Sequence, residues 1–493
     1  MNMNRRNFLR RSAIVGTGLL TAKTVSAQHE HHTQPQPQSP KNSAPAQSRS
    51  RPNMEKVSAP AGNVPVITPD LPKLPWNMEN GVKVFHLSAD VVKREFLPAA
   101  PWGPAKVVDV WGYNGSMPGP TIEVNEGDRV RIVFHNNLPE ETTIHWHGLE
   151  IPIEMDGMPY ISQPPVKPGG MFVYEFTLNQ SGTFFYHSHG AMQEMMGQIG
   201  LFVIHPKNPY RPAVHKDFGL ILQEWAVLPN NTVPNSMAME FNWLTINGKA
   251  GPATTPMIVK QGERVRIRLV NLGMDHHPIH IHGHQFYVTG TEGGRIPESA
   301  WFPGNTVLVG VAQARDIEFD AIHPGDWMLH CHLPHHMMNQ MISMVGPMAH
   351  VGHGMQTGAG MEEGMGIVRE GHATAEHLGP AMGRGMGIAT DRERAVSAGI
   401  GGQHEHHGAN ADQEVKKRVP GYPQDEMMMM VMDEAVAKPE NNGLAPGWTS
   451  MMQGMMSLIR ILPADKYEKL MADIREGRVE KPKYQQEHKH NEE

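Results

Sequence analysis

The chain of 493 residues contains a single cysteine, Cys331, which lies between two histidines in the stretch HCHLPHHMMNQM. One thiol excludes an intramolecular disulfide and a C-x-x-C zinc or redox site, because each needs two. A buried apolar cysteine, a catalytic nucleophile and a metal thiolate remain. If WMLHCHL is extended, His330 and His332 share one face of the strand and Cys331 points to the other. The thiol would then serve one centre and the two histidines another.

Four H-x-H pairs show that the chain contains an internal duplication. The pairs are His145 and His147, His187 and His189, His280 and His282, and His330 and His332. The third pair repeats the first at an offset of 135 (280 − 145), and the fourth repeats the second at an offset of 143 (330 − 187). Imidazole binds copper, zinc and iron, and eight ligands exceed the needs of one ion. We therefore expect several metal ions held between two similar domains.

The duplication also separates the cysteine site from the histidine pairs. Near Cys331 lie His277, His336 and Met341, which complete the two-His, one-Cys site with a weak axial Met that holds blue copper. Moved back by the repeat offsets, the four positions become Thr142, Ser188, Gln193 and Gln198. None of these is a soft ligand. Only the second domain is therefore predicted to hold a type 1 (blue) copper.

The elements that position these residues are predicted to be strands. The alternating segments RVRIVF and RVRIRLV are broken by Gly, Pro and Asn, and the chain contains 50 Gly and 41 Pro. These features favour β-sandwiches over helices. We expect an all-β fold with domain 1 at residues 61–207 and domain 2 at residues 208–350.

The N-terminus resembles an export signal. Arg5 and Arg6 precede a short apolar run that ends in VSA at Ala27, which is typical of a twin-arginine signal peptide at residues 1–27. Residues 28–60 are rich in Gln, Pro and Ser and are predicted to be a disordered linker. A periplasmic or secreted protein with no integral membrane segment is expected. The net charge of −7 argues against nucleic acid as a partner.

The C-terminal extension, residues 351–493, is a low-complexity sequence rich in Met and His. Thioether and imidazole bind Cu(I), so we expect the extension to bind extra copper and to be separable from the two predicted domains. Within it, residues 448–476 have a helix-like apolar spacing, with Pro463 and Asp465 suited to a helix start. A short helical hairpin is predicted there, and the alternative to a separable extension is that residues 448–474 pack on the core.

Together, the motifs HWHG, HSHGAMQ, HPIHIHGH and HCHLPHHMMNQM resemble the copper-binding motifs of the multicopper oxidases over residues 65–350. The resemblance implies cupredoxin-like Greek-key sandwiches and four copper ions in each functional unit. The type 1 ligands would be His277, Cys331, His336 and Met341; the type 2 ligands His145 and His280; and the type 3 ligands His147, His187, His189, His282, His330 and His332. His276 and His335 are alternatives to their neighbours, and Met337 and Met338 are alternatives to Met341.

Only 90 residues (277 − 187) separate the second motif from the third, too few for an intervening domain. The chain thus resembles a two-domain multicopper oxidase of the small-laccase type. That resemblance implies a homotrimer whose trinuclear site forms between domain 1 of one subunit and domain 2 of the next.

The same resemblance implies an enzyme that couples one-electron oxidation of phenols, or of reduced metal ions such as Cu(I), to reduction of dioxygen to water. His336 would accept electrons from a small reducing substrate, and Cys331 would pass them on. Asp156 is a candidate proton relay, although an Asp-Gly pair also suits a turn. Two alternatives are a two-domain copper nitrite reductase and a non-catalytic periplasmic copper-binding or copper-resistance protein.

Overall fold

The computed structural model describes residues 57–337, 339 and 431–481, apart from residues 59, 101, 102, 191 and 228–230. The chain divides into two units, residues 1–53 and 54–493, and every described residue belongs to the second. The predicted signal sequence, most of the predicted linker, Met338, Met341 and residues 351–430 therefore lie outside the described residues. In the described ranges, no helix has the length and apolar character needed to cross a membrane.

Domain 1 is a sandwich of two sheets. One sheet has the order β2-β3-β6-β8, with β4 paired to β3, and contains β2 (Trp76–Glu79), β3 (Val82–Leu97), β4 (Lys106–Tyr113), β6 (Arg129–Asn136) and β8 (Met171–Thr177). The other has the order β5-β10-β9-β7 and contains β5 (Gly119–Asn125), β7 (Ile144–His147), β9 (Gly182–Ser188) and β10 (Ile199–His205). The alternating residues of RVRIVF pack Val130, Ile132 and Phe134 into the core between the sheets.

Domain 2 repeats this plan with additional strands. Its first sheet contains β1 (Val66–Ile67), β11 (Lys216–Trp225), β12 (Trp243–Ile246), β14 (Arg264–Asn271), β16 (Phe286–Thr291), β17 (Gly294–Arg295), β18 (Phe302–Gly304) and β20 (Gln313–Asp320). Its second sheet has the order β13-β22-β21-β15-β19, with β13 (Met257–Lys260), β15 (His277–Ile281), β19 (Thr306–Val309), β21 (Gly325–Cys331) and β22 (Met456–Leu462). The predicted all-β fold with cupredoxin-like sandwiches is confirmed.

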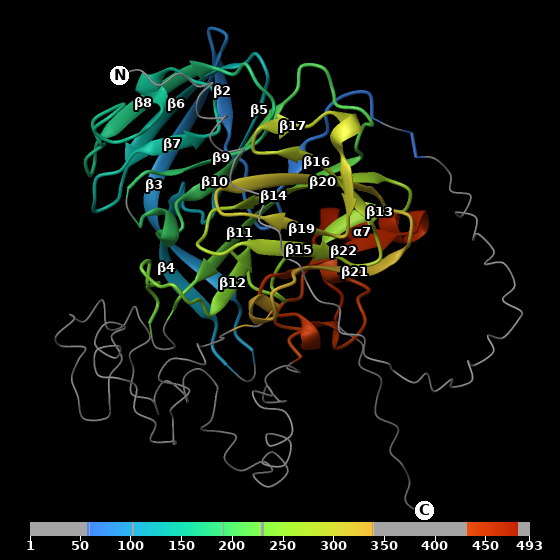
Figure 1. Ribbon diagram of the computed structural model, residues 1–493. Helices are drawn as coiled ribbons and strands as arrows, with labels where there is room; N and C mark the ends of the chain where they lie inside the picture. The colour runs from blue at the N-terminus through green and yellow to red at the C-terminus, as the bar shows by residue number, and fades with distance from the viewer. Residues whose placement is uncertain are drawn as a thin grey trace, which may run out of the picture. The chain divides into compact units, whose positions relative to one another are not determined.

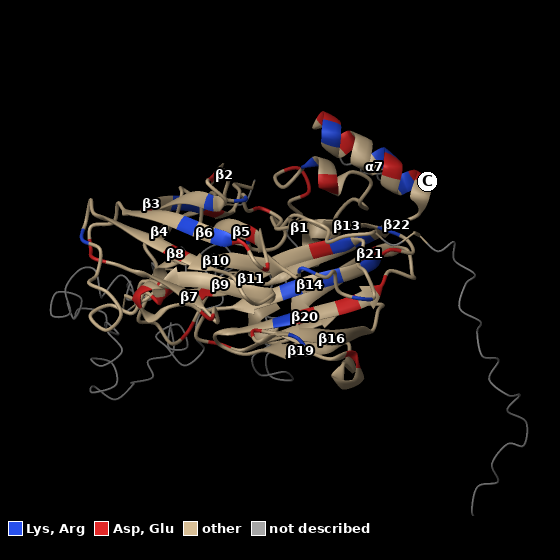
Figure 2. Cartoon of the chain, turned by 90° about the horizontal axis from the view of Figure 1, so that it is seen from above, with Lys and Arg blue, Asp and Glu red and all other residues tan. Residues whose placement is uncertain are grey.

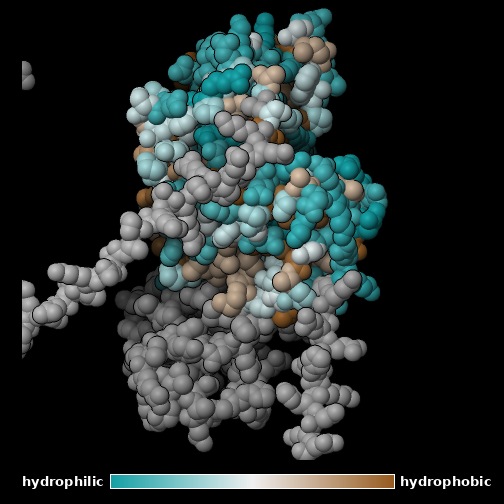
Figure 3. Space-filling view, turned by 90° about the vertical axis from the view of Figure 1, so that its right-hand side faces the viewer, coloured by the Kyte–Doolittle hydropathy of each residue, from teal (hydrophilic) through white to brown (hydrophobic). Residues whose placement is uncertain are grey.

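Helical structure in the described residues is limited to short connections and one α-helix. The 3-10 turns are η1 (Ile153–Met155), η2 (Glu194–Met196), η3 (Glu298–Ala300), η4 (Pro334–Met337), η7 (Pro439–Asn441) and η8 (Trp448–Met451), and the α-helix is α7 (Ala464–Glu476). Helix α7 covers β22 and β13, because Tyr467 and Leu470 pack against Ile258 and Leu462. The face of the molecule that lies on the right in Figure 1 is mostly hydrophilic, with smaller apolar areas (Figure 3).

Strand β22 completes the second sandwich, although it comes from the C-terminal extension. In domain 1, Ile199 of β10 pairs with His187 of β9; in domain 2, Met456 of β22 pairs with His330 of β21. The offset of 257 (456 − 199) exceeds the repeat offset of 143 by 114. Figure 1 shows this late strand among strands from the middle of the chain. An insertion of 114 residues thus precedes the last strand of domain 2 in the sequence.

The predicted helical hairpin at 448–476 is therefore wrong in its first half, whereas its second half is the helix α7, which begins directly after Pro463 as expected. All seven residues of β22 are buried between β13 and β21. A strand buried on both faces reads as a continuous apolar run, and periodicity cannot distinguish such a run from a helix. The expectation that the whole extension is separable from the core is wrong for the same reason.

A buried interface joins the two domains. Phe185 and Leu201 of domain 1 pack with Ile221 and Val270 of domain 2 in one apolar cluster. Beside it, Arg264, Arg266 and Arg268 of β14 pair with Asp320, Glu318 and Asp316 of β20, a charged ladder visible on these strands in Figure 2. The ladder reaches domain 1, because Thr183 donates a hydrogen bond of 2.6 Å to Asp316 and accepts one of 2.6 Å from Arg268.

Candidate metal centres

The side chains of His277, Cys331 and His336 meet in a buried pocket of domain 2. His277 begins β15, Cys331 ends β21 and His336 lies in η4. The Cys331 Sγ atom is 3.4 Å from Nδ1 of His336 and 3.9 Å from Nδ1 of His277, and the two Nδ1 atoms are 3.2 Å apart. Two imidazole nitrogens and one sulfur therefore face a common point. Their exposed fractions are 1% or less.

The alternative histidines do not reach this point. His335 and His276 are exposed, and Nδ1 of His276 accepts a hydrogen bond from the amide of Val311. His335 packs edge-on against the ring of His336, with ring centroids 4.2 Å apart. Among the histidines of these two adjacent pairs, the structure brings His277 and His336 to the cysteine.

Two carboxylates hold the imidazoles from behind. Glu224 of β11 lies with its Oε2 atom 3.1 Å from Nε2 of His277, and Oδ2 of Asp275 lies 3.4 Å from Nε2 of His336. Such partners fix the ring orientation and leave Nδ1 free to bind a metal. Glu224 is fully buried and also accepts hydrogen bonds from the amides of Met274 and Asp275. The sequence reasoning missed both carboxylates.

Burial raises the pKa of Cys331 to about 12, so the metal-free thiol carries its proton at neutral pH. A metal thiolate forms only when that proton leaves, and metal binding to Cys331 therefore releases a proton. Two imidazoles and one thiolate in a buried site form a donor set for a soft or borderline metal ion. This donor set fits copper.

Met455 occupies the place at which the domain 1 pocket has Gln198. The amide of Ser188 donates to the carbonyl of Gln198, and the amide of Cys331 donates to the carbonyl of Met455. Met455 is fully buried and packs in the same cluster as Cys331. The expected axial ligand, Met341, lies outside the described residues. The structure therefore places Met455, which the sequence reasoning missed, at the backbone position that Gln198 has in domain 1.

A signal for Met455 was present in the sequence. The segment GQIGLFVI at residues 197–204 and the segment GMMSLIRI at residues 454–461 share the glycine and the apolar residues that follow it. Both glycines have positive φ, 111° at Gly197 and 57° at Gly454. A search for the missing last strand of the second repeat, beyond residue 350, could have found it.

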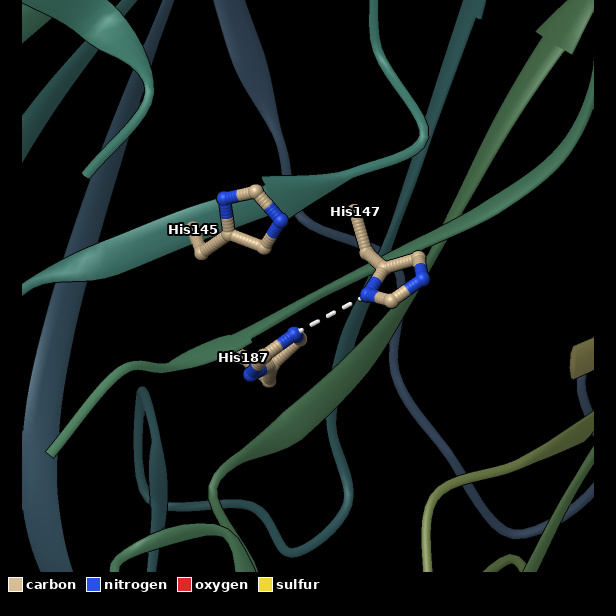
Figure 4. Close-up of side chains that lie close together, drawn as sticks. All are labelled: His145, His147 and His187. Carbon is tan, nitrogen blue, oxygen red and sulfur yellow. Dashed lines mark hydrogen bonds between the residues drawn. The ribbon is translucent and has the colours of Figure 1, made fainter. Parts of the chain in front are cut away.

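The histidine pairs of domain 1 form one set (Figure 4). His145 and His147 lie on β7, His187 lies on β9, and Nδ1 of His147 is 3.2 Å from Nε2 of His187. His145 donates from Nδ1 to the carbonyl of Asp156 at 2.8 Å, and His187 donates from Nδ1 to the carbonyl of Ser188 at 2.8 Å. The ring of His189 lies 5.5 Å from that of His145, centroid to centroid. Because the Nδ1 atoms of His145 and His187 face carbonyl groups, a metal would bind these two rings through Nε2, and Nε2 of His187 faces Nδ1 of His147.

The pairs of domain 2 form a matching set. His280 and His282 lie on β15 and directly after it, and Nε2 of His282 is 3.1 Å from Nε2 of His330. His280 donates from Nδ1 to the carbonyl of Asn305, and His330 donates from Nδ1 to the carbonyl of Cys331 at 2.8 Å. The ring of His332 lies 5.3 Å from that of His330, centroid to centroid. His282 and His332 are exposed at the protein surface.

The two histidine sets are separate from each other in the described part of the chain. Among the described residues, every ring contact between two of these eight histidines joins members of the same set. Burial lowers the pKa of His147 to about 4 and also lowers the pKa of His145, His282 and His330. Neutral imidazoles are the form that binds metal. Both sets fit copper by donor type.

Asp156 lies beside the first set. Its Oδ1 atom is 3.4 Å from Nδ1 of His145, and its backbone follows the turn η1. Gly157 is required next, because an added Cβ would lie 1.8 Å from the carbonyl oxygen of Ile144. Asp156 is thus both a turn residue and a neighbour of a candidate metal-binding imidazole.

Two multicopper oxidase family models match the chain, at residues 100–209 and 226–346. The chain belongs to the multicopper oxidase family. A copper resistance protein A homolog of Pseudomonas syringae pv. tomato is 42% identical over 113 residues, which are 23% of this chain and 19% of that protein. Laccase-1 of Fomitopsis schrenkii is 30% identical over 284 residues, which are 50% of this chain and 51% of that protein.

Among solved structures of the family, a blue copper oxidase from Nitrosomonas europaea is 31% identical, with a TM-score of 0.46, over 52% of this chain and 81% of that one. The chain spans about a fifth of the length of the copper resistance relative and about half that of the laccase.

Proposed function

We propose that this protein is a copper-dependent oxidase that couples one-electron oxidation of a small reducing substrate to reduction of dioxygen to water. The observation that carries the proposal is the alternation at the end of β21. Cys331 faces the pocket of His277 and His336, whereas the adjacent His330 belongs to the surface histidine set. A few covalent bonds therefore connect the two sites.

Four copper ions for each functional unit are proposed. The type 1 ion would be held by His277, Cys331 and His336. Met455 is the proposed axial ligand because of its place in the described residues, and the predicted Met341 stays an untested alternative. The type 2 and type 3 ions would be held by His145, His147, His187, His189, His280, His282, His330 and His332. Copper bound at these sites would supply one-electron redox chemistry in the Cys331 pocket and four-electron reduction of dioxygen at the histidine sets.

Individual residues have proposed roles in electron entry and proton transfer. His336 is the proposed point of electron entry, because its Nε2 atom faces Asp275, whose side chain is 39% exposed. Glu224 closes the corresponding side of His277. Asp156 is proposed to hold and move protons next to His145, which its carbonyl orients.

We further propose a homotrimer in which domain 1 of one subunit meets domain 2 of the next. Each domain has exposed apolar residues near its histidine pairs in the sequence or the sheet. Ile153, Tyr160 and Ile161 lie in the sequence between the two H-x-H pairs of domain 1, and Leu308 lies on β19, which pairs with β15. Apolar surface of this kind is typical of protein interfaces. A heterologous contact between the two faces would close into a ring and complete each centre.

Mixing two inactive variants tests the shared centre. His145→Ala breaks the domain 1 half, and His330→Ala breaks the domain 2 half. Reassembly of an equal mixture should restore activity at about one in four interfaces, where both halves are intact. Verified mixed trimers without activity, or a fully active monomer, would contradict a centre shared between subunits.

Export through the twin-arginine pathway, a periplasmic or secreted location and extra copper binding by the Met and His residues of the extension are also proposed. They rest on the sequence of segments outside the described residues. Phenols and reduced metal ions such as Cu(I) are the proposed reducing substrates. The names of two relatives, a copper resistance protein and an iron transport multicopper oxidase, support including Cu(I) and Fe(II) in the assays.

Three measurements on one copper-loaded sample test the proposed activity. We expect oxygen uptake with a phenol, Cu(I), Fe(II) or Mn(II), no reduction of nitrite, and four copper ions for each chain in the assembled core. Nitrite reduction without oxygen uptake would favour the nitrite reductase. Copper binding without any turnover would favour the copper-binding protein.

A further inference from the structure

One continuous segment supplies Gln193 and Gln198 to the domain 1 pocket. Two separate segments supply the corresponding residues to the domain 2 pocket. Gln193 and Gln198 are five residues apart, whereas their counterparts His336 and Met455 are 119 apart (455 − 336). Asn339 corresponds to Met196 (339 − 143) and Gly454 corresponds to Gly197 (454 − 257). In domain 1 a peptide bond joins these two positions. In domain 2 the insertion separates them.

Hydrogen bonds of Asn339 span that break. Its amide donates to Oε1 of Gln453 at 3.1 Å, and its Oδ1 atom accepts from the amide of Gly454 at 3.0 Å. Its Nδ2 atom donates to the carbonyl of Gly251 at 2.8 Å, and the amide of Gly251 donates to the carbonyl of Gly454 at 2.8 Å. Asn339 is buried, and the two hydrogen bonds of its side chain are sheltered from water.

Gly454 immediately precedes Met455, whose backbone is also fixed. The amide of Met455 donates to the carbonyl of His336 at 2.9 Å, and its carbonyl accepts from the amide of Cys331 at 3.1 Å. Met455 is therefore held between the two pieces of the pocket, and Asn339 fixes the residue at which the second piece enters it. Loss of the Asn339 side chain would leave the Gly454 amide and the Gly251 carbonyl short of partners in a buried place.

We propose that Asn339 is a positioning residue for the type 1 site. Asn339 joins the two ends of the insertion and thereby sets the distance of the Met455 thioether from the copper. This inference rests on the proposed function, in which Met455 is the axial ligand. The axial ligand tunes the reduction potential of such a site. A looser thioether donates less charge to Cu(II), so the potential rises when the junction is weakened.

Asn339→Ala in the full-length, copper-loaded protein tests the proposal, with Asn442→Ala as a matched control. Both asparagines are 8% exposed, accept a hydrogen bond from a backbone amide and donate one to a backbone carbonyl, but Asn442 lies beside α7. Asn339→Ala should raise the reduction potential and shift the thiolate absorption band. Asn442→Ala should lower the thermal midpoint and leave both copper properties unchanged.

Two further readouts keep the test informative if Asn339→Ala loads copper poorly. In the copper-free protein, exchange of the Cys331 and Met455 amides should become about tenfold faster in Asn339→Ala than in Asn442→Ala. Gln453→Ala removes one acceptor at the same junction and should give a smaller shift of the potential in the same direction. Equal exchange rates in the two asparagine variants would overturn the proposal.

Met455→Leu separates this inference from the axial assignment. If Met455→Leu leaves the potential unchanged, the axial ligand of the proposed function is wrong. If it raises the potential while Asn339→Ala behaves like Asn442→Ala, the axial assignment stands and the role of Asn339 fails. If both raise it, Asn339→Ala should add nothing further in the Met455→Leu background, because it acts through that side chain.

Discussion

The pocket of domain 1 that corresponds to His277, Cys331 and His336 contains Thr142, Ser188 and Gln193. Thr142 lies 2.9 Å from the Ser188 hydroxyl and donates to Oε1 of Gln193 at 2.7 Å, and Ser188 donates to the same Oε1 at 2.5 Å. The three domain 1 side chains satisfy one another. The three of domain 2 instead turn their donor atoms to one point, where a metal can bind.

The two pockets differ less in backbone than in side chains. Gln198 and Met455 make the same backbone hydrogen bonds, yet both amide atoms of the buried Gln198 have no hydrogen-bond partner among the described residues. Glu224, which supports His277, corresponds to the exposed Val91 (224 − 91 and 244 − 111 both give 133). The pocket that contains the candidate copper ligands is thus also the one that has a supporting carboxylate.

Truncation after Gly352 should have the largest effect on this comparison, because it removes β22, the counterpart of β10. Five buried apolar side chains of β22, worth about 1.5–3 kcal/mol each, would be lost from a domain whose stability is about 5–15 kcal/mol. We expect no cooperative unfolding transition for domain 2 and no thiolate absorption band. Scanning calorimetry and absorption spectra measure both.

Replacement of residues 345–425 by a Gly-Ser linker is the control for the truncation. It keeps Asn339 and residues 431–481, and should retain the transition and the band. A truncated protein that still binds type 1 copper would contradict the role of β22.

Cys331→Ser makes the domain 2 pocket resemble that of domain 1 at one position. A hydroxyl does not replace a thiolate as a soft ligand, so the thiolate band should disappear and turnover should fall by more than about 100-fold. The histidine sets are untouched, and their copper should remain. Copper analysis with absorption spectra distinguishes the sites. A blue, active variant would disprove the assignment of Cys331.

Glu224→Gln tests whether the Glu224 carboxylate contributes to copper affinity in domain 2. Domain 1 has Val91 at the corresponding position and therefore no such carboxylate. His277 would keep its place but lose a charged partner, so type 1 copper affinity should fall by about 10–100-fold. Copper titration followed by the thiolate band measures it. Glu263→Gln, which alters a buried carboxylate bonded to the amide of Lys260, should leave the affinity unchanged. Equal affinities in both variants would show that Glu224 is dispensable.

Grafting ligands into domain 1 should have the smallest effect. Thr142→His, Ser188→Cys, Gln193→His and Gln198→Met, combined in a Cys331→Ser background, should give a weak thiolate band. Affinity should be about 10–100-fold below that of the native pocket, because Val91 supplies no carboxylate. Addition of Val91→Glu should strengthen the band. No band in either protein would indicate that the two backbones differ more than their hydrogen bonds suggest.

The ligand types and the duplication could be read from the sequence because they depend on local spacing. An H-x-H pair on a strand must place both rings on one face, and the offsets of 135 and 143 assign counterparts between domains. The all-β fold followed from the same alternation. The contrast between Cys331 and Ser188 could be predicted in the same way, since equivalent residues of a repeat occupy equivalent places.

Only the tertiary structure decided which distant segments meet. Sequence spacing selected Met341 because it lies ten residues after Cys331, but hydrogen bonds and strand register bring Met455 to the position of Gln198. Glu224 approaches His277 from a neighbouring sheet, and β22 enters its sheet after the 114-residue insertion. Contacts between residues far apart in sequence depend on packing and on strand register. The periodicity of a single segment gives no information about either.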